Sequence, residues 1–280
     1  MQGSISGRDE EDCAAGSAGA GLEPRGRKGA GPSIDLTAQA YEQIEELFVS
    51  FRIAPGSSLR TQDIQSLVGL GRTPVHQAIR RLAAETLFEV RPRNGLRVAP
   101  IDLARERHLA ILRRDLMRFV TEAAMRNLTP NTRSRIHYLR RELLSPDVPM
   151  TVDRFNGIDK SFDILLIQAS GERFLERTLR PLHAIARRTG YLHLTQIGGA
   201  AGLASTVERH VAIMDAILSD DFETARSTCD DLIAFGIAMI EALEDKVDPQ
   251  WLDAAFAPLS ASAPGRASLL TAPKAEETFS

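Results

Sequence analysis

The sequence has few of the features that mark secreted, disulfide-bonded or membrane proteins. It contains two cysteines, Cys13 and Cys229, which stand in unlike surroundings and give no disulfide framework. No apolar run approaches the roughly 18 residues of a membrane span, and the N-terminus lacks the apolar stretch of a signal peptide. These absences predict a cytoplasmic protein with no membrane partner.

Aromatic residues and net charge are also sparse. Aromatic residues make up 5% of the chain, which favours aliphatic helical packing over a β-sandwich. The net charge of −3 and the isoelectric point of about 6.1 give no overall sign of nucleic-acid binding. Between Arg72 and Arg97, however, six arginines stand against two glutamates. A DNA duplex responds to such a local field rather than to the chain's average charge.

What is present divides the chain into two patterned regions between two tails. Residues 1–34 are rich in Gly, Ala, Ser and charge without a helical or strand period, which predicts a disordered tail. Residues 248–280, rich in Ala, Ser and Pro, predict a flexible tail, although Trp251, Leu252 and Phe256 leave room for a short docked helix. We expect one domain over 35–100 and a second over 101–247.

The first region combines three helical patterns with a hairpin. Apolar spacing predicts one helix up to Phe51, a second from Thr61, and a third with Thr73 as its N-cap. The Asn94-Gly95 pair between two short β-prone segments predicts a hairpin with a type I′ turn. The order of helix, helix, turn, helix and hairpin is that of a winged helix-turn-helix domain.

The second region carries helical patterns alone. Six helices are expected, near 103–127, 131–145, 151–169, 172–191, 204–218 and 221–245. Antiparallel helices of this length form a bundle whose interior can hold a small ligand. The predicted fold class is therefore mainly α, with an N-terminal winged helix-turn-helix (three helices plus a β-hairpin wing) and a C-terminal all-α six-helix bundle.

The third helix of the first region carries the residues expected to contact DNA. In a helix-turn-helix, the N-terminal part of the recognition helix faces base edges in the major groove. The exposed positions there are Arg72, Thr73, His76, Gln77 and Arg80. Arginine can bind guanine and glutamine can bind adenine, while Thr73 and nearby amides suit phosphate. Arg93, Gly95 and Arg97 surround the hairpin tip, where a wing reaches the adjacent backbone. The alternative is an ordinary solvated arginine face.

Four stretches of this region are distinctive. They are 54–59 (APGSSL), 70–75 (LGRTPV), 78–82 (AIRRL) and 91–98 (RPRNGLRV). Together they resemble the winged helix-turn-helix of the GntR family of bacterial regulators. The helical region looks like the FCD effector domain of the FadR-type subfamily, so the resemblance covers about residues 37–245. It implies a transcription regulator that binds double-stranded operator DNA.

The resemblance also assigns roles to single residues of the DNA-binding region. Arg72 matches the family's main DNA-contacting arginine, and Gly95 matches its wing-tip glycine. Gln62 and His76 stand where the family usually has arginines. With two permanent charges fewer, we expect weaker phosphate binding and an altered operator preference.

In the helical region, the resemblance implies a divalent metal held by one aspartate and three histidines beside a small carboxylate effector. Asp159 and His210 keep the expected identities, whereas Asp163 and Leu232 stand where the family has histidines. A site of Asp159, Asp163 and His210 suits Mg²⁺ or Mn²⁺ better than Zn²⁺. The alternative is that both aspartates are solvated or paired with an arginine.

Arginine side chains offer a second way to hold an effector. Arg113 stands where the resemblance implies an inward-facing arginine, and Arg187 and Arg188 lie on a helix expected to line the interior. An arginine fork would bind a carboxylate bidentately. Arg113, with Asp159, Asp163 and His210, forms the predicted effector site. The alternative places these arginines on the surface or in salt bridges with the aspartates.

These features predict an effector-responsive regulator that binds a near-palindromic operator as a homodimer. The alternative is a constitutive DNA-binding and dimerisation protein that has lost its effector and metal site. A hydrolytic metal centre at Asp159, Asp163 and His210 is not favoured, because no nucleophile motif, phosphate loop or zinc-protease spacing accompanies it. The chain is therefore not expected to be an enzyme.

Overall fold

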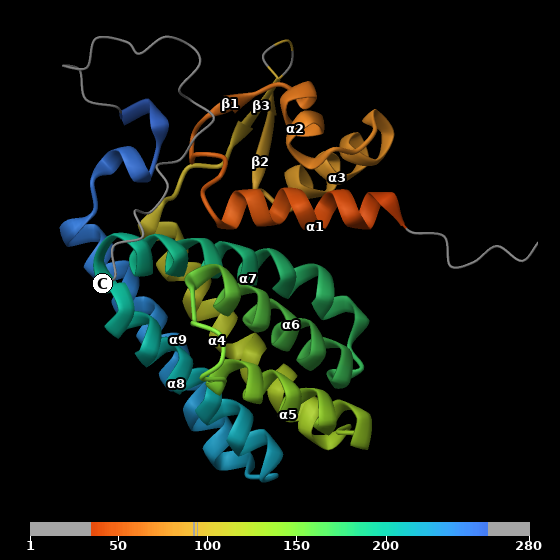
Figure 1. The fold of residues 1–280 in the computed structure, drawn as a ribbon, viewed down its shortest axis with the longest axis vertical. Coiled ribbons are helices and arrows are strands. Elements are labelled where there is room, and N and C mark those ends of the chain that lie inside the picture. The colour runs from red at the N-terminus through yellow and green to blue at the C-terminus, as the bar shows by residue number, and fades with distance from the viewer. Residues whose placement is uncertain (1–34, 92, 94, 257–280) are drawn as a thin grey trace, which may run out of the picture. The chain divides into compact units, whose positions relative to one another are not determined.

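The computed structural model describes residues 35–256 apart from Pro92 and Asn94 (Figure 1). The predicted disordered tail 1–34, with Cys13, lies outside the described residues, as does the greater part of the predicted flexible tail. The described residues belong to one compact unit.

The N-terminal part of this unit is a winged helix-turn-helix. Its elements are α1 (Leu36–Val49), β1 (Ser58–Leu59), α2 (Thr61–Val68), α3 (Arg72–Ala84), β2 (Phe88–Arg91) and β3 (Gly95–Val98). The strands form one antiparallel sheet in the order β1-β3-β2. The Asp35 carboxylate caps α1 by accepting from the amides of Thr37 and Ala38, and Gly69 ends α2 in the left-handed region. The predicted order is confirmed, and β1 adds a strand that was not predicted.

Helix α3 begins two residues earlier than predicted from an N-cap at Thr73. Its N-cap is Gly71, and the Val75 amide donates to the Gly71 carbonyl at 3.3 Å. Pro74 therefore falls within the first turn. A backbone N–H at that position would have no intrahelical acceptor, so proline loses no hydrogen bond there.

The hairpin also differs from the predicted two-residue turn. Arg91 pairs with Gly95, so residues 92–94 connect the strands and Gly95 opens β3. Asn94 itself lies outside the described residues. Gly95 has a φ of +80°, and a Cβ there would lie 2.5 Å from the Leu59 carbonyl oxygen. Its glycine identity thus has a structural cause, the close passage of β1.

Residues 103–246 form six α-helices, as predicted. They are α4 (Leu103–Arg126), α5 (Pro130–Leu144), α6 (Val152–Ser170), α7 (Arg173–His193), α8 (Gly199–Leu218) and α9 (Phe222–Lys246). Helix α4 packs on α9 and α6, and α8 packs on α9 and α5. The expected break before 204 is instead a π-helical turn, Leu194–Gly198, so that α8 begins at Gly199.

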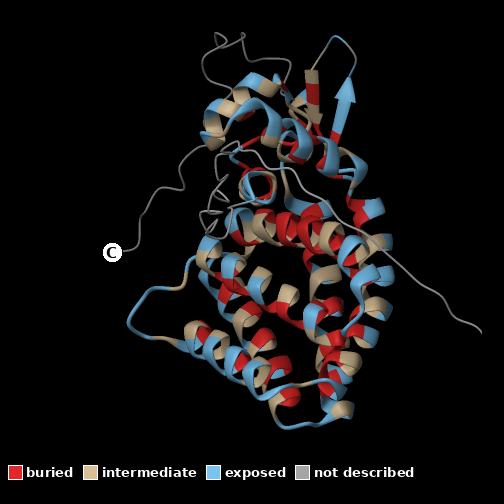
Figure 2. Cartoon of the chain, turned by 90° about the vertical axis from the view of Figure 1, so that its right-hand side faces the viewer, coloured by how far each residue is buried: buried red, intermediate tan, exposed pale blue. Residues whose placement is uncertain are grey.

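Buried residues lie on the facing sides of the helices (Figure 2). The core of the winged domain does not stop at its own elements, because it includes Ala184 and Ile185 of α7. Helix α1 consequently packs along α7, as Figure 1 also shows. Apolar burial therefore joins the two domains.

Residues 248–256, at the start of the predicted flexible tail, are docked, which is the alternative that Trp251, Leu252 and Phe256 left open. Two short 3₁₀ turns, Pro249–Trp251 and Ala254–Phe256, follow α9. The Leu252 carbonyl accepts from the Ile101 amide, and the Ala254 amide donates to the Pro55 carbonyl, each at 2.8 Å. This segment thus reaches the strands of the winged domain.

Candidate DNA-binding surface and ligand pocket

The predicted base-contacting residues lie on the outer side of α3. Val75, Ile79 and Leu82 are buried and hold the opposite side of this helix against the core. The exposed residues are Arg72, Thr73, His76, Gln77 and Arg80, with Gln62 on α2. Within the described residues, no ion pair or hydrogen bond involves the side chains of Arg72, His76 or Arg80, which leaves these groups open to a partner.

Gln77 is the exception on this surface. Its side-chain oxygen accepts a hydrogen bond from the Thr37 hydroxyl of α1 at 2.7 Å. A bidentate contact with adenine uses both the oxygen and the nitrogen of the amide. Gln77 would therefore have to release Thr37 in order to bind adenine in that way.

The two arginines of the predicted wing differ. Arg93 is exposed at the hairpin tip, with a φ of +67°. Arg97 instead donates from Nη2 to Asp253 Oδ2 at 2.6 Å and from Nε to the Gly56 carbonyl at 3.3 Å. Asp253 is buried, and it lies so close to Gly56 that a Cβ there would collide with it. Sequence reasoning missed Asp253, because the segment that carries it was expected to be flexible.

A cavity of about 120 Å³ lies within the helical domain. Its lining includes the four predicted effector residues Arg113, Asp159, Asp163 and His210. These residues come from α4, α6 and α8, and Arg187 of α7 joins them. A space of this size accommodates several waters or a small organic molecule.

Asp159 and His210 form a buried pair in this cavity. His210 Nε2 lies 3.1 Å from Asp159 Oδ1, and His210 Nδ1 lies 2.7 Å from the Thr206 carbonyl. Burial is the largest single influence on Asp159 and disfavours its charge, but the hydrogen bond and charge of His210 together with the charge of Arg187 outweigh it and lower the pKa of Asp159 to about 2. Burial is also the largest influence on His210 and opposes its charge, yet the hydrogen bond and charge of Asp159 together with the Thr206 carbonyl and the charge of Asp163 raise the pKa of that imidazole. The pair is therefore held as an ion pair.

Asp163 is held by two cationic or polar side chains of α7. Its Oδ2 lies 2.8 Å from His183 Nδ1 and 2.8 Å from Arg187 Nη1. The same Arg187 nitrogen lies 3.9 Å from Asp159 Oδ2, so one guanidinium faces both aspartates. His183 was not predicted. It stands one helical turn before Arg187, and this i, i+4 spacing was the signal that could have found it.

These contacts do not fit the metal that the resemblance implies. Asp163 is already bonded to the Arg187 guanidinium and to His183, and Leu232 provides no ligand at the fourth position. Among the residues that the structure describes, no group of three or more His, Cys, Asp or Glu side chains is arranged to hold a metal ion. The set of Asp159, Asp163 and His210 thus has the chemistry of a salt-bridge cluster with Arg187.

Arg113 is the cation of the cavity whose bonding is incomplete. Its Nε is buried and has no hydrogen-bond partner within the described residues. Burial lowers the pKa of Arg113, while the charges of Asp163 and Asp159 act in the opposite direction. Arg188 lies outside the cavity lining: its guanidinium packs over Phe48 at 3.9 Å and donates from Nη1 to the Ala99 carbonyl at 2.8 Å, while its Nε and Nη2 lack partners in the described residues. The arrangement can accept an anion at Arg113.

Glu106 is a second lining residue that was not predicted. It is 6% exposed and accepts a hydrogen bond from the Thr189 hydroxyl. Burial raises the pKa of Glu106 to about 7, although Thr189 and Arg188 act against this rise. The cavity thus contains a carboxyl group that titrates near neutral pH.

Comparison with known proteins gives two family matches. Residues 36–98 match the family described as bacterial regulatory proteins, gntR family, and residues 108–235 match the FCD domain. Within the described ranges, no helix is long and apolar enough to cross a bilayer.

Individual relatives align over about two thirds of this chain. The HTH-type transcriptional repressor RspR of Escherichia coli is 24% identical over 193 residues, which are 68% of this chain and 82% of that protein. An HTH-type transcriptional regulator from Streptomyces ambofaciens is 26% identical over 67% of this chain and 77% of its own length.

Solved structures show the same fold. The structure of E. coli McbR/YncC superposes with a TM-score of 0.66 at 19% identity, covering 75% of this chain and 99% of that one. A regulator from Rhodococcus sp. RHA1 gives a TM-score of 0.57 at 17% identity, covering 74% of this chain and 97% of that one. The family and these relatives are transcriptional regulators rather than enzymes, and the chain belongs to the GntR family, with an FCD domain behind its winged helix-turn-helix.

Proposed function

We propose that the protein binds a near-palindromic operator as a homodimer, and that a small carboxylate in the helical domain modulates this binding. The observation that carries the DNA-binding half is the outer side of α3, where Arg72, His76 and Arg80 are exposed. Their apolar neighbours fix this helix against the core, so the polar groups are presented on a rigid element.

Selection from a pool of random duplexes tests DNA binding. The selected duplex is titrated with protein and followed by fluorescence anisotropy. We expect one motif to be enriched and to bind at least about 1,000-fold more tightly than unrelated DNA. Equal affinity for selected and unrelated duplexes would contradict operator recognition.

Arg113 supports the effector half of the proposal. Its side chain lines a cavity of small-molecule size, and its buried Nε lacks a hydrogen-bond partner in the described residues. A carboxylate would supply the missing acceptor, because guanidinium groups bind carboxylates bidentately. Asp159, Asp163 and His210 then line the remainder of the site.

A thermal-shift screen of small carboxylates tests this site. A ligand that binds only the native state must raise the melting temperature. We expect a hit with the wild-type chain, loss of the shift in Arg113→Met, and an unchanged shift in Arg114→Met. Arg114 is the matched control, since its Nε pairs with the exposed Asp115 at 3.2 Å. If no carboxylate alters stability or operator affinity, the constitutive alternative replaces the effector half.

An exposed apolar face on α4 supports the homodimer. Ile111, Leu112 and Phe119 lie within about two turns of one helix and are 44%, 50% and 55% exposed. A second copy of the chain would cover this face and place two recognition helices on two half-sites. Phe119→Glu should give a monomer in sedimentation velocity, whereas Phe174→Glu on α7 should not. Dimers of both variants would exclude this face as the interface.

A further inference from the structure

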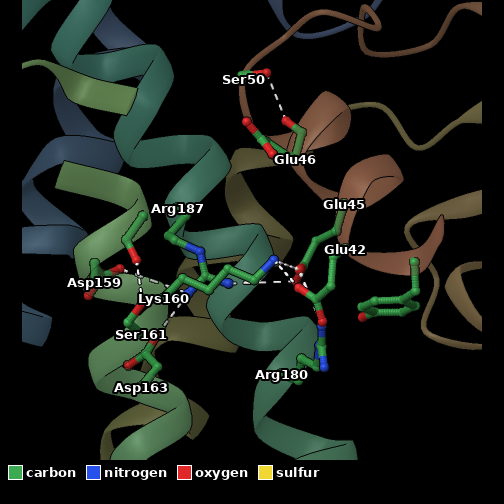
Figure 3. Close-up of polar contacts among 12 residues, drawn as sticks. Glu42, Glu45, Glu46, Ser50, Asp159, Lys160, Ser161, Asp163, Arg180 and Arg187 are labelled. Carbon is green, nitrogen blue, oxygen red and sulfur yellow. Dashed lines mark hydrogen bonds and ion pairs between the residues drawn. The ribbon is translucent and has the colours of Figure 1, made fainter. Parts of the chain in front are cut away.

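The contact between the two domains contains a cluster of charged side chains beside the ligand cavity. Helix α1 contributes Glu42 and Glu45, and the helical domain contributes Lys160, Arg180 and Arg187 (Figure 3). Glu45 is 1% exposed, although its neighbour Glu46 on the same helix is exposed. A buried carboxylate is costly unless cations compensate it, so the position of α1 on α7 depends on this cluster.

The cations around Glu45 are not equivalent. Lys160 Nζ bonds directly to Glu45 Oε2, and Arg180 Nη2 lies 3.6 Å from the same oxygen. Arg187 Nη2 approaches the other oxygen, Oε1, to 3.6 Å, which is beyond hydrogen-bond distance. Glu45 Oε1 is buried and has no hydrogen-bond partner in the described part of the chain. A small displacement of Arg187 toward α1 would satisfy this oxygen.

Arg187 is drawn in the other direction by the ligand cavity. Its Nη1 is hydrogen-bonded to Asp163 at 2.8 Å and faces Asp159 at 3.9 Å. The guanidinium therefore lies between the carboxylates of the effector site and the carboxylate of α1, with its hydrogen bond on the effector side. Figure 3 shows Arg187 extending from α7 between these two groups.

There is space for the guanidinium to move. A second cavity of about 200 Å³ lies at this junction, and Arg187 lines both cavities. Its lining also includes Glu42, Lys160, Asp163 and Arg180. Buried charges beside open space can exchange partners without repacking a dense core.

We propose that Arg187 links the effector site to the DNA-binding domain, because the anionic groups of the cavity and Glu45 compete for its guanidinium. An added anion at Arg113 draws Arg187 toward the cavity and leaves Glu45 less compensated, which loosens α1 from α7. Loss of negative charge in the cavity lets Arg187 bind Glu45 and tightens the contact. This inference rests on the proposed function and specifies how the site regulates it.

A double-mutant cycle tests the link without any effector. The variants are Asp163→Asn, Glu45→Gln and the pair together, with Asp153→Asn and Glu46→Gln as matched exposed controls on α6 and α1. Operator affinity is measured by anisotropy on the selected duplex. We expect Asp163→Asn to change affinity in the presence of Glu45 and to have little effect in Glu45→Gln, a coupling of about 5-fold or more. The control pair should be additive.

Hydrogen exchange of the α1 amides supplies a readout that needs neither DNA nor ligand. Asp163→Asn should slow exchange across α1, and Glu45→Gln should remove that slowing. Additive effects in the cycle together with unchanged α1 exchange would overturn the link. If the wild-type chain selects no duplex, the proposed function fails, while the exchange experiment still decides whether Arg187 couples the cavity to α1. If one of the cycle variants unfolds, Arg187→Lys is used instead. Lysine retains the positive charge but lacks the guanidinium fork, and it should abolish the coupling between the cavity and α1.

Discussion

The recognition surface and the ligand cavity use the same residue types in opposite ways. On α3, Arg72 and Arg80 are exposed and have no ion pair within the described residues. In the cavity, Asp159, Asp163 and Arg187 are already bonded to one another or to histidines. This difference is what the proposed function requires: the charges of α3 stay available to an external partner, while most charges of the cavity are bonded within the protein. Among the described residues that line the cavity, only Arg113 retains an unmet hydrogen bond.

The largest effect that this contrast predicts is on stability. Arg187→Ala should lower the free energy of unfolding by about 3–5 kcal/mol, because it leaves Asp159, Asp163 and Glu45 without their shared cation. Urea unfolding measures this change. Arg80→Ala, on the open surface, should alter stability by no more than about 0.5 kcal/mol. Equal effects of the two substitutions would remove the distinction between the regions.

The raised pKa of Glu106 predicts that the free energy of unfolding depends on pH, and that this dependence arises in the buried region. Because its pKa is raised from 4.5 to about 7, the folded state holds a proton that the unfolded state has lost, and stability falls as pH rises between these values. Glu106→Gln should remove this component. The difference in unfolding free energy between wild type and variant should grow up to about pH 7 and then level, reaching at most about 3 kcal/mol. A difference independent of pH from 4 to 8 would contradict the buried, neutral carboxyl.

The next effect concerns Arg72, on the exposed recognition surface of α3. Arg72→Ala should cost about 1–3 kcal/mol of discrimination between the selected duplex and one with its contacted guanine replaced. Its melting temperature should stay that of the wild type, since the exposed Arg72 side chain makes no hydrogen bond or ion pair within the described residues. Arg141→Ala, an exposed arginine on α5, controls for the loss of one charge. Retained discrimination in Arg72→Ala would rule out the proposed docking of α3.

The smallest effect concerns Arg97. This predicted DNA contact resembles the cavity residues in that its guanidinium is already paired with a carboxylate of the protein. Its guanidinium is held by Asp253, so Asp253→Asn should free it for phosphate. Operator affinity should rise a few-fold, and the slope of log K against log salt should steepen by about one unit. Asp248→Asn, on the same segment, should leave the slope unchanged. An unaltered slope in Asp253→Asn would mean that the wing arginine does not reach DNA.

Local pattern predicted the fold well, because helix periodicity, breaks and caps are properties of neighbouring residues. All six helices of the second domain and the three of the first were expected. The errors occur where distant segments decide the geometry. Gly95 opens β3 because β1 passes against it, and Asp253 docks because Gly56 and Arg97 receive it.

The residues of the candidate site were likewise only partly predictable from the sequence. Arg113, Asp159 and His210 were found from the family resemblance, and they line one cavity. The partners Arg187 and Asp163 were named, but their bond was only one of two alternatives. Glu45 was missed, because a glutamate within an amphipathic helix is typical of a solvated face. Its cations lie more than 100 residues away in the sequence, beyond any local pattern.

The melting temperature of the whole 280-residue chain, measured alone, with the selected duplex and with Zn²⁺, tests the contrast most directly. A partner of the native state raises the melting temperature by mass action. The duplex should therefore raise it, whereas Zn²⁺ should leave it unchanged, because Asp163 is bonded to Arg187 and Leu232 provides no ligand. This contrast would be contradicted if Zn²⁺ raised the melting temperature or if the duplex did not. In either case the charges of α3 would not be the ones available to a partner, or those of the cavity would not be fully occupied within the protein.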